Sequence, residues 1–423
     1  MSKDRRLQPG WMTELYFYLA IALGTNSIFF VFNVATRGKP AELPTALSST
    51  QPGYILMWLL LWAWTAILIA RSAYRNEVQW SLVFALPVIA LVFGSALWSV
   101  SPATTLYFGS ILTANIFVAY VLATTRDPDF FLSVLKSSLA LCVFASFLLL
   151  MISPETAAAE RFGGGWLGGL DFNGVFPHKS AAGYNFGLLL IGLISGAGGT
   201  WRPLAALAMG VIAFVALLFT NSATGLAGTI FVCFVIVAFR VLRLESKPIL
   251  ALIALGCVVF ALVSPFLPFG GTAEFVGRDS GLTGRAPIWA AGIEAFLKRP
   301  MLGYGYDGFF YPGDFSPVWD VWNAESYFKT PHFHNSGIEV AVSFGVVGLV
   351  VYGLILLVAF FVIGNATLSP KVRLGLVAAL WLMTLSSAFD FTFLFHNSFG
   401  SIFLFYCFFA SQTAYAHART EQG

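Results

Sequence analysis

The chain of 423 residues is too apolar and too poor in charge for a soluble domain. Hydrophobic residues make up 58% of it and charged residues 10%, whereas an ordinary soluble domain has about 25% charged residues. The formal net charge of +3 lacks the strongly basic character that is typical of nucleic-acid-binding proteins. The composition therefore predicts an integral membrane protein with the lipid bilayer, and no nucleic acid, as its partner.

Apolar runs recur along the chain and predict an all-α fold, a polytopic transmembrane bundle that forms one membrane domain over residues 1–423. A helix needs about 20 apolar residues to cross the hydrocarbon core, and the alternation that barrel strands require does not appear. We predict about twelve spans, at residues 13–35, 53–70, 78–97, 104–124, 130–152, 181–197, 203–220, 224–240, 248–267, 336–363, 372–390 and 395–416.

The connections between these spans show a charge asymmetry that predicts the orientation. Lys and Arg precede the first span and occupy the even-numbered connections, whereas short opposite connections such as 98–103 and 221–224 carry none. Arg37 and Lys39 are the exception. By the positive-inside rule, both termini are cytoplasmic, and we expect the membrane to be a bacterial inner membrane.

The two longest connections, 153–180 and 268–335, then fall on the periplasmic side. The second joins the ninth and tenth spans and far exceeds the usual connection of about 4–6 residues. It is rich in Trp, Tyr, Phe and Gly, a composition that favours a structured loop over a disordered one. We therefore expect the active site at the periplasmic face.

Histidine and basic side chains gather in these two loops. The first loop holds Arg161 and ends in FNGVFPHKSAAG, which places His178 and Lys179 just before the sixth span. The large loop carries Arg285 within LTGRAPIW. It closes with HFHNSGIE at the start of the tenth span, a motif that contains His332, His334, Asn335 and Glu339.

Such a set suits the displacement of a diphosphate. Arg presents a fixed fork of donors to phosphate oxygens, and Lys179 and His178 would add to the positive field. A histidine with a pKa near neutrality can accept a proton from a sugar hydroxyl, and Asn335 or Glu339 could orient it. Neither role needs a metal ion, and the four cysteines lie inside apolar spans, so we predict no metal site and no cofactor.

Simpler interpretations stay open for several of these residues. Arg161 and Lys179 can reach out to lipid headgroups without binding a substrate. His332 and His334 can cap the tenth span. Two further ionisable residues flank the last outer turn, and we interpret them as a structural polar pair, Asp390 with His396.

Four motifs occur in the order GVFPHKSAAG, LTGRAPIW, PMLGYGYDGF and HFHNSGIEVAVSFGVVG. They resemble the motifs of the O-antigen ligase and Wzy-type polymerase superfamily, over about residues 160–350. The first is most similar to exopolysaccharide polymerases of the succinoglycan kind, although Ser180 replaces the Asn that is usual there. The resemblance implies a GT-C-like fold and a periplasmic glycan donor linked to undecaprenyl diphosphate, without metal or nucleotide sugar.

The same resemblance implies roles for individual residues. Arg285 would bind the donor diphosphate, with Arg161 and Lys179 in support, and His334 would be the catalytic base. The leading hypothesis is a polymerase that joins lipid-linked repeat units into exopolysaccharide as an acceptor hydroxyl displaces the lipid diphosphate. A chain-length regulator or export proteins are candidate partners. The large loop also holds tyrosines that can stack on sugar faces or pack the loop, Tyr304 and Tyr306.

Two other functions remain open. An O-antigen ligase would use the same donor and transfer the glycan to lipid A core. A polysaccharide or lipid transporter would need charged groups along a path through the bilayer midplane. Almost all ionisable residues lie at span ends or in outer loops, and Lys136 and Glu339 are the main exceptions.

Overall fold

The computed structural model describes residues 10–28, 52–74, 80–160, 170–199, 201–242, 247–267, 285–311, 313, 317–319 and 332–420. The first half of the chain forms α1 (Trp11–Gly24), α3 (Pro52–Tyr74), α4 (Leu86–Gly94), α5 (Pro102–Thr125), α6 (Pro128–Ile152), α7 (Pro154–Ala157) and α8 (Lys179–Ser195). The second half forms α9 (Pro203–Phe219), α10 (Ala223–Val241), α11 (Lys247–Val263), α13 (Arg285–Lys298), α15 (Ser336–Asn365), α16 (Pro370–Ser387) and α17 (Phe399–Thr420). Short 3-10 helices are η1 (Trp80–Ala85), η2 (Ser95–Leu97) and η3 (Ser264–Phe266).

This architecture confirms the predicted all-α membrane class. Within the described ranges, six helices are long and apolar enough to cross a membrane, namely α3, α5, α6, α10, α11 with η3, and α15. Shorter apolar helices cover Leu86–Leu97, Pro203–Phe219 and Phe399–Ala410. Each predicted span overlaps a helix, although α1 ends at Gly24 and the rest of the predicted first span lies largely outside the described residues. The number of about twelve membrane spans remains a prediction.

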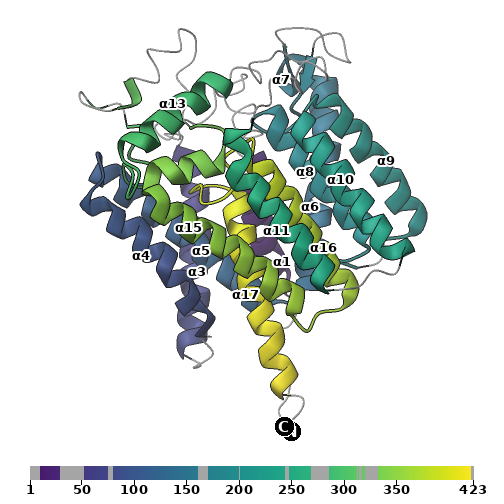
Figure 1. The fold of residues 1–423 in the computed structure, drawn as a ribbon. Coiled ribbons are helices and arrows are strands. Elements are labelled where there is room, and N and C mark those ends of the chain that lie inside the picture. The colour runs from purple at the N-terminus through teal and green to yellow at the C-terminus, as the bar shows by residue number, and fades with distance from the viewer. Residues whose placement is uncertain are drawn as a thin grey trace.

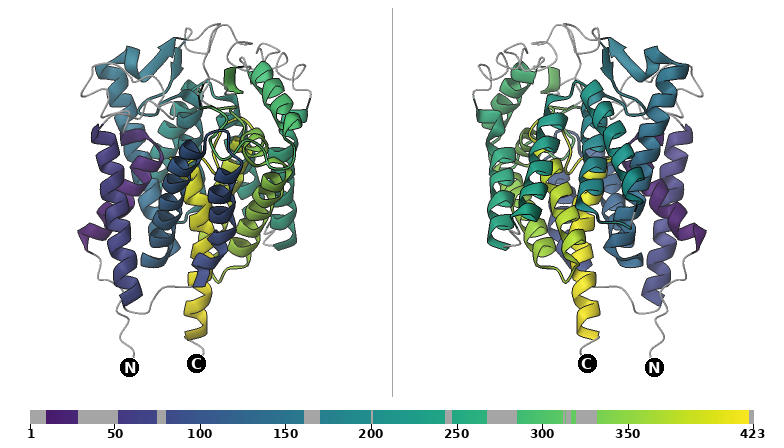
Figure 2. Two further views of the ribbon diagram at one scale, coloured as in Figure 1. Left: turned by 90° about the vertical axis from the view of Figure 1, so that its left-hand side faces the viewer. Right: turned by 90° about the vertical axis from the view of Figure 1, so that its right-hand side faces the viewer.

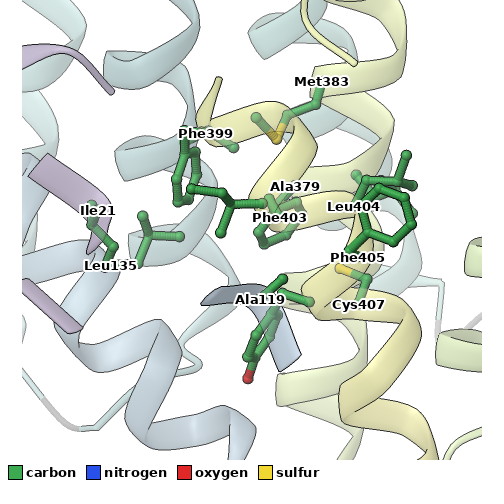
Figure 3. Packing of buried hydrophobic residues seen from close by; sticks show 14 of the residues in the cluster. Ile21, Ala119, Leu135, Ala379, Met383, Phe399, Phe403, Leu404, Phe405 and Cys407 are labelled. Carbon is green, nitrogen blue, oxygen red and sulfur yellow. The ribbon is translucent and has the colours of Figure 1, made fainter. Parts of the chain in front are cut away.

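The core of the bundle surrounds α17, which packs along α5 and also contacts α1 and α15. Figure 3 shows aromatic residues of this helix, Phe399 and Phe403, among aliphatic residues of other helices. The rings of Phe131 on α6 and Tyr406 on α17 stack with centroids 3.8 Å apart. Close-packed side chains of this kind fix the position of α17, and with it the loop that precedes it.

The described parts of both predicted outer loops lie at one end of the bundle. Helices α7 and α13 are found there, and the C-terminal part of α17 lies at the opposite end (Figures 1 and 2). In the first loop, a short antiparallel pair joins β1 (Ala158–Glu160) to β2 (Leu170–Phe172), with Ala158 opposite Phe172. This relative placement is the one that the predicted topology requires.

Helix α15 is broken at Gly345, whereas the sequence predicts one continuous span. Gly345 has φ 67° and ψ −155°, a conformation that is essentially restricted to glycine. Residues 300–305 form backbone hydrogen bonds with α15 on both sides of this break. Val346 N donates to Pro300 O at 2.8 Å, and Tyr304 N donates to Val342 O at 2.8 Å. The outer half of α15 is therefore a separate short helix held by residues 300–305.

We predict that Gly345→Ala unfolds the protein at a lower temperature. An added Cβ would lie 2.3 Å from the carbonyl group of Met301, and the positive φ adds strain, so the substitution should cost roughly 2–5 kcal/mol. Gly364→Ala on the same helix is the control, because a Cβ there meets nothing within 4 Å. Thermal unfolding in detergent, followed by circular dichroism, gives both values. Equal stability of the two variants would contradict a stabilising role for the docking of residues 300–305 at Gly345, which we call the interlock.

Candidate active site

Four chain segments meet at the end of the bundle that carries the predicted outer loops. His178 precedes α8, Arg285 begins α13, His334 precedes α15, and Asp390 lies in the connection between α16 and α17. Burial lowers the pKa of His178 and of His332, and the positive charge of Arg285 adds to that lowering, so the arginine lies near both histidines. Three predicted residues from separate motifs therefore share one site, and Asp390 joins them.

Asp390 is the centre of this group, which we call the histidine–aspartate cluster: His178, His332, His334 and Asp390. Its carboxylate lies 3.7 Å from Nε2 of His178 and 3.6 Å from Nδ1 of His334. Burial alone would raise the pKa of Asp390, but the facing histidines, His178 and His334 above all, hold it well below its usual range. The carboxylate therefore stays ionised.

The interpretation of Asp390 and His396 as a polar pair is wrong. Nδ1 of His396 lies 2.9 Å from Oδ2 of Asp307, and the imidazole stacks on Phe108 with centroids 4.2 Å apart. This contact joins the segment before α17 to the middle of the large loop. It leaves Asp390 to His178 and His334.

A left-handed turn brings the imidazoles of His332 and His334 close together, edge to face. His334 has φ 53°, a conformation that non-glycine residues adopt only under strain, and its backbone N donates to Nδ1 of His332 at 3.2 Å. The two ring centroids are 4.1 Å apart. Nδ1 of His334 is buried and has no hydrogen-bond partner among the described residues. Burial, helped by the charge of His334, holds the pKa of His332 well below its usual range.

The two ring nitrogens of His178 face different neighbours. Its Nδ1 accepts the backbone N–H of Ala181 at 3.2 Å, so this residue is the N-cap of α8. The proton of the neutral ring must then be on Nε2, which faces Asp390. Burial lowers the pKa of His178, and the charge of Asp390 opposes that effect only in part. The imidazole is therefore a neutral donor towards the carboxylate.

Lys179 is paired with an acid. Its Nζ lies 2.7 Å from Oδ2 of Asp171, which β2 supplies. Sequence reasoning did not connect these residues, because Asp171 reaches Lys179 only when the first loop folds back on itself. The predicted role of Lys179 in binding a diphosphate remains a proposal, and Arg161 lies outside the described residues.

Asn335 and Glu339 hold the backbone of the site and do not reach the imidazole of His334. Asn335 is the N-cap of α15: its Oδ1 accepts from Ile338 N at 3.0 Å, and its Nδ2 donates to Ala388 O at 2.7 Å. The carboxylate of Glu339 accepts the backbone N–H of Phe333. Asp390 is thus the residue that faces the predicted base. Sequence reasoning named Asp390 but paired it with His396, because its real partners are far away along the chain.

The contacts of Tyr304 and Tyr306 favour packing over sugar stacking. Both side chains are buried. The guanidinium of Arg299 covers the ring of Tyr304 at 4.7 Å, and the hydroxyl of Tyr306 donates to Leu394 O at 2.7 Å. These tyrosines join the middle of the large loop to the rest of the bundle, so they are not among the groups that we assign to the reaction.

Helix α13 is held against the histidine segment. Nε1 of Trp289 donates to Phe333 O at 2.9 Å, and a Cβ on Gly292 would lie 2.5 Å from a methyl carbon of Ile338. This close approach fixes the axis of α13 (Figure 1). It explains why Arg285, the first residue of the helix, acts on the same histidines.

The sequence predicts no metal site, but three side chains of the cluster lie close enough together to bind an ion. Among the described residues, His332, His334 and Asp390 each offer a ligand atom, and these atoms lie within 4.8 Å of one another. The cysteines are separate, since Cys142, Cys233, Cys257 and Cys407 are all free. The chemistry available in the cluster is therefore proton transfer, or the binding of a cation.

Fold and site together define a class: a multi-pass helical membrane protein whose outer-loop segments place an arginine beside a histidine–aspartate cluster. A family model described as O-Antigen ligase matches residues 208–353. The chain is also 27% identical over 376 residues to the exopolysaccharide production protein ExoQ of Rhizobium meliloti (strain 1021), and the alignment covers 85% of this chain and 79% of that relative. The resemblance to the O-antigen ligase family, on its exopolysaccharide side, is thus confirmed.

We predict that Asn335→Ala destabilises the protein. It removes an N-cap, worth about 1 kcal/mol, and leaves the buried Ala388 carbonyl without that donor, for a total of roughly 2–4 kcal/mol. Asn365→Ala is the matched control at the other end of α15, because its side chain is exposed and bonds only to Phe361 O. The melting temperatures in detergent should differ by several degrees. A shift of the same size in both variants would argue against this anchor.

Proposed function

We propose that this protein is a glycosyltransferase of the inner membrane that polymerises undecaprenyl-diphosphate-linked repeat units into exopolysaccharide at the periplasmic face. The observation that carries the proposal is the pairing of His334 with Asp390 at the end of the bundle where Arg285 also lies. A base and a cation in one site are what the displacement of a diphosphate by a hydroxyl requires. The family match and the exopolysaccharide relative support the substrate class.

His334 takes the proton of the acceptor hydroxyl. With Nδ1–H directed at the carboxylate of Asp390, the lone pair of Nε2 is available as the base. The 3.6 Å separation of Nδ1 and Oδ1 is long for a hydrogen bond, and we expect it to shorten when substrate binds. Asp390 thereby acts as a positioning residue and stabilises the imidazolium that forms.

The acceptor oxygen then attacks the anomeric carbon of the donor glycan. A new carbon–oxygen bond forms, and the bond to the lipid diphosphate breaks with its electron pair on the leaving oxygen. Direct displacement inverts the configuration at this carbon. No step of this route needs a metal ion.

Positive charge near the leaving group comes from Arg285 and from helix ends. Arg285 is the first residue of α13, and α8 and α15 also begin at the cluster. The N-terminus of a helix carries a partial positive charge that favours phosphate. Arg161 and Lys179 are proposed to add to this field, and the Lys179 ammonium would do so while paired with Asp171.

Transport is the weaker alternative. The two charged residues that a midplane path would use both have local partners: Nζ of Lys136 donates to Gly199 O at 3.3 Å, and Glu339 accepts from Phe333 N. A ligase that transfers the glycan to lipid A core would use the same donor and the same cluster. The acceptor therefore separates the ligase from the polymerase.

We predict that purified protein converts undecaprenyl-diphosphate-linked repeat units into a ladder of longer glycans. His334→Ala should lower kcat by about 10²–10⁴-fold, the usual contribution of a general base, and Arg285→Ala should also abolish the ladder. Addition of a chelator should leave the wild-type rate unchanged. Lys298→Ala, at the exposed end of α13, is the control and should remain active.

Each other result of this assay has a clear meaning. Products that appear only when lipid A core is added would replace the polymerase with the ligase. Full activity of both His334→Ala and Arg285→Ala would reject the site. Loss of activity on chelation would reject the metal-free route.

We predict that Asp390→Asn lowers kcat at least about 10-fold with little change in KM, because the amide no longer holds His334 in the reactive tautomer. Asp390→Glu, which restores the carboxylate, should recover part of the rate. Steady-state kinetics with the lipid-linked donor measures both. A merely structural role would instead lower the amount of folded protein and leave kcat per folded molecule intact.

A further inference from the structure

Three side chains of the cluster could together bind a metal ion, a function that the proposed transfer reaction does not need. His332, His334 and Asp390 place one ligand atom each within 4.8 Å of the others. Two imidazoles and one carboxylate form the protein ligand set of many zinc sites, which leave a fourth position open. The residues come from two segments of the bundle, so the donors are positioned by the fold and not by a flexible loop.

The separation of His334 from Asp390 is close to that around a tetrahedral ion. With bonds of about 2.0–2.2 Å to nitrogen and oxygen, ligand atoms around zinc lie roughly 3.3–3.5 Å apart. Nδ1 of His334 and Oδ1 of Asp390 are 3.6 Å apart, so an ion fits between them after a small movement. Nδ1 of His334 is also the buried nitrogen that lacks a hydrogen-bond partner among the described residues.

His178 lies outside the ligand set and supports it. Its Nδ1 accepts from Ala181 N, so its Nε2 carries the proton and has no lone pair to give. That N–H faces Oδ2 of Asp390 at 3.7 Å, on the side away from His334. An outer donor of this kind orients a ligating carboxylate.

Binding has one local cost at His332. Nδ1 of this residue accepts the backbone N–H of His334 at 3.2 Å. Coordination through Nδ1 takes up that lone pair, and coordination through Nε2 puts a proton on Nδ1, so the hydrogen bond is lost in either case. It is long and neutral, and a metal–nitrogen bond replaces it.

We propose that His332, His334 and Asp390 form a binding site for Zn²⁺, and that the bound ion inhibits the enzyme. The inhibitory part rests on the proposed function. An ion on Nδ1 of His334 leaves the proton of the neutral ring on Nε2, which then has no lone pair for the acceptor hydroxyl. It also occupies the carboxylate that would stabilise the imidazolium. Zinc binding and catalysis therefore exclude each other.

Co²⁺ serves as the visible probe of this site. Chelator-treated protein with a tag free of histidine is titrated with Co²⁺ in detergent, and tetrahedral coordination gives strong absorption in the visible range that Zn²⁺ then abolishes. His332→Ala and Asp390→Asn should each weaken binding by roughly 100-fold or more, since loss of even an outer-shell partner costs about 10–100-fold. His417→Ala, near the end of α17, is the matched histidine control and should bind as wild type does.

X-ray absorption of the zinc-loaded wild type needs no variant. It should show nitrogen and oxygen ligands with imidazole scattering and no sulfur. Absence of the Co²⁺ band, sulfur in the zinc shell, or equal binding by wild type and His332→Ala would overturn the site. These readouts do not depend on turnover, so they decide the metal site even if the transfer assay fails.

The transfer assay tests the consequence. Zn²⁺ should stop ladder formation by wild type, and excess chelator should restore it. Stoichiometric binding that leaves the rate unchanged would overturn the inhibitory role and remove His334 from the reaction.

Discussion

The break of α15 at Gly345 is the constraint on which the site depends. A continuous helix from Ser336 to Asn365 would satisfy its own backbone, and residues 300–305 would have no donors or acceptors to bind. Because the helix opens there, these residues insert and bond to both sides of the break. The outer half of α15 is thereby held in position, and Asn335 at its start fixes the turn that carries His332 and His334.

The ionisable side chains in and around the cluster face one another over short distances. A carboxylate between imidazoles stays ionised, while burial keeps the pKa of His178 and His332 low. Lys179 has Asp171, and His396 has Asp307. The positive field proposed for an anionic substrate comes from Arg285 and the three helix ends, to which Lys179 and Arg161 are proposed to add.

Much of this arrangement could be predicted from the sequence, because hydropathy and motif order are local signals. Apolar runs located the helices, and the outer-loop motifs supplied His178, Arg285 and His334. The break at Gly345 could not be predicted, since SFGVVGLVVYG contains several glycines and only the docking of residues 300–305 decides which one opens. Asp390 was assigned to His396 for a similar reason: both are near in sequence, whereas their real partners come from distant segments. Tyr304 and Tyr306 looked available for sugars until their burial was known.

The family match ends at residue 353 and begins at 208, so it includes Arg285 and His334 but leaves out His178 and Asp390. The site therefore draws on parts of the chain that lie on both sides of the matched region. The longer alignment with the exopolysaccharide relative spans most of both chains. Helices from the whole bundle, and not only those of the matched region, therefore position the proposed base.

The interlock at Gly345 is made of backbone groups, and this has an evolutionary meaning. Main-chain hydrogen bonds do not depend on which side chains accompany them, so the exposed positions of this segment, Met301 and Leu302, can be exchanged while the docking persists. The glycines and the buried Tyr304 are restricted: a Cβ on Gly303 would lie 2.3 Å from Val342 O. Side chains beside the reacting groups can thus change, and adapt to new sugars, while the backbone arrangement that positions those groups is kept.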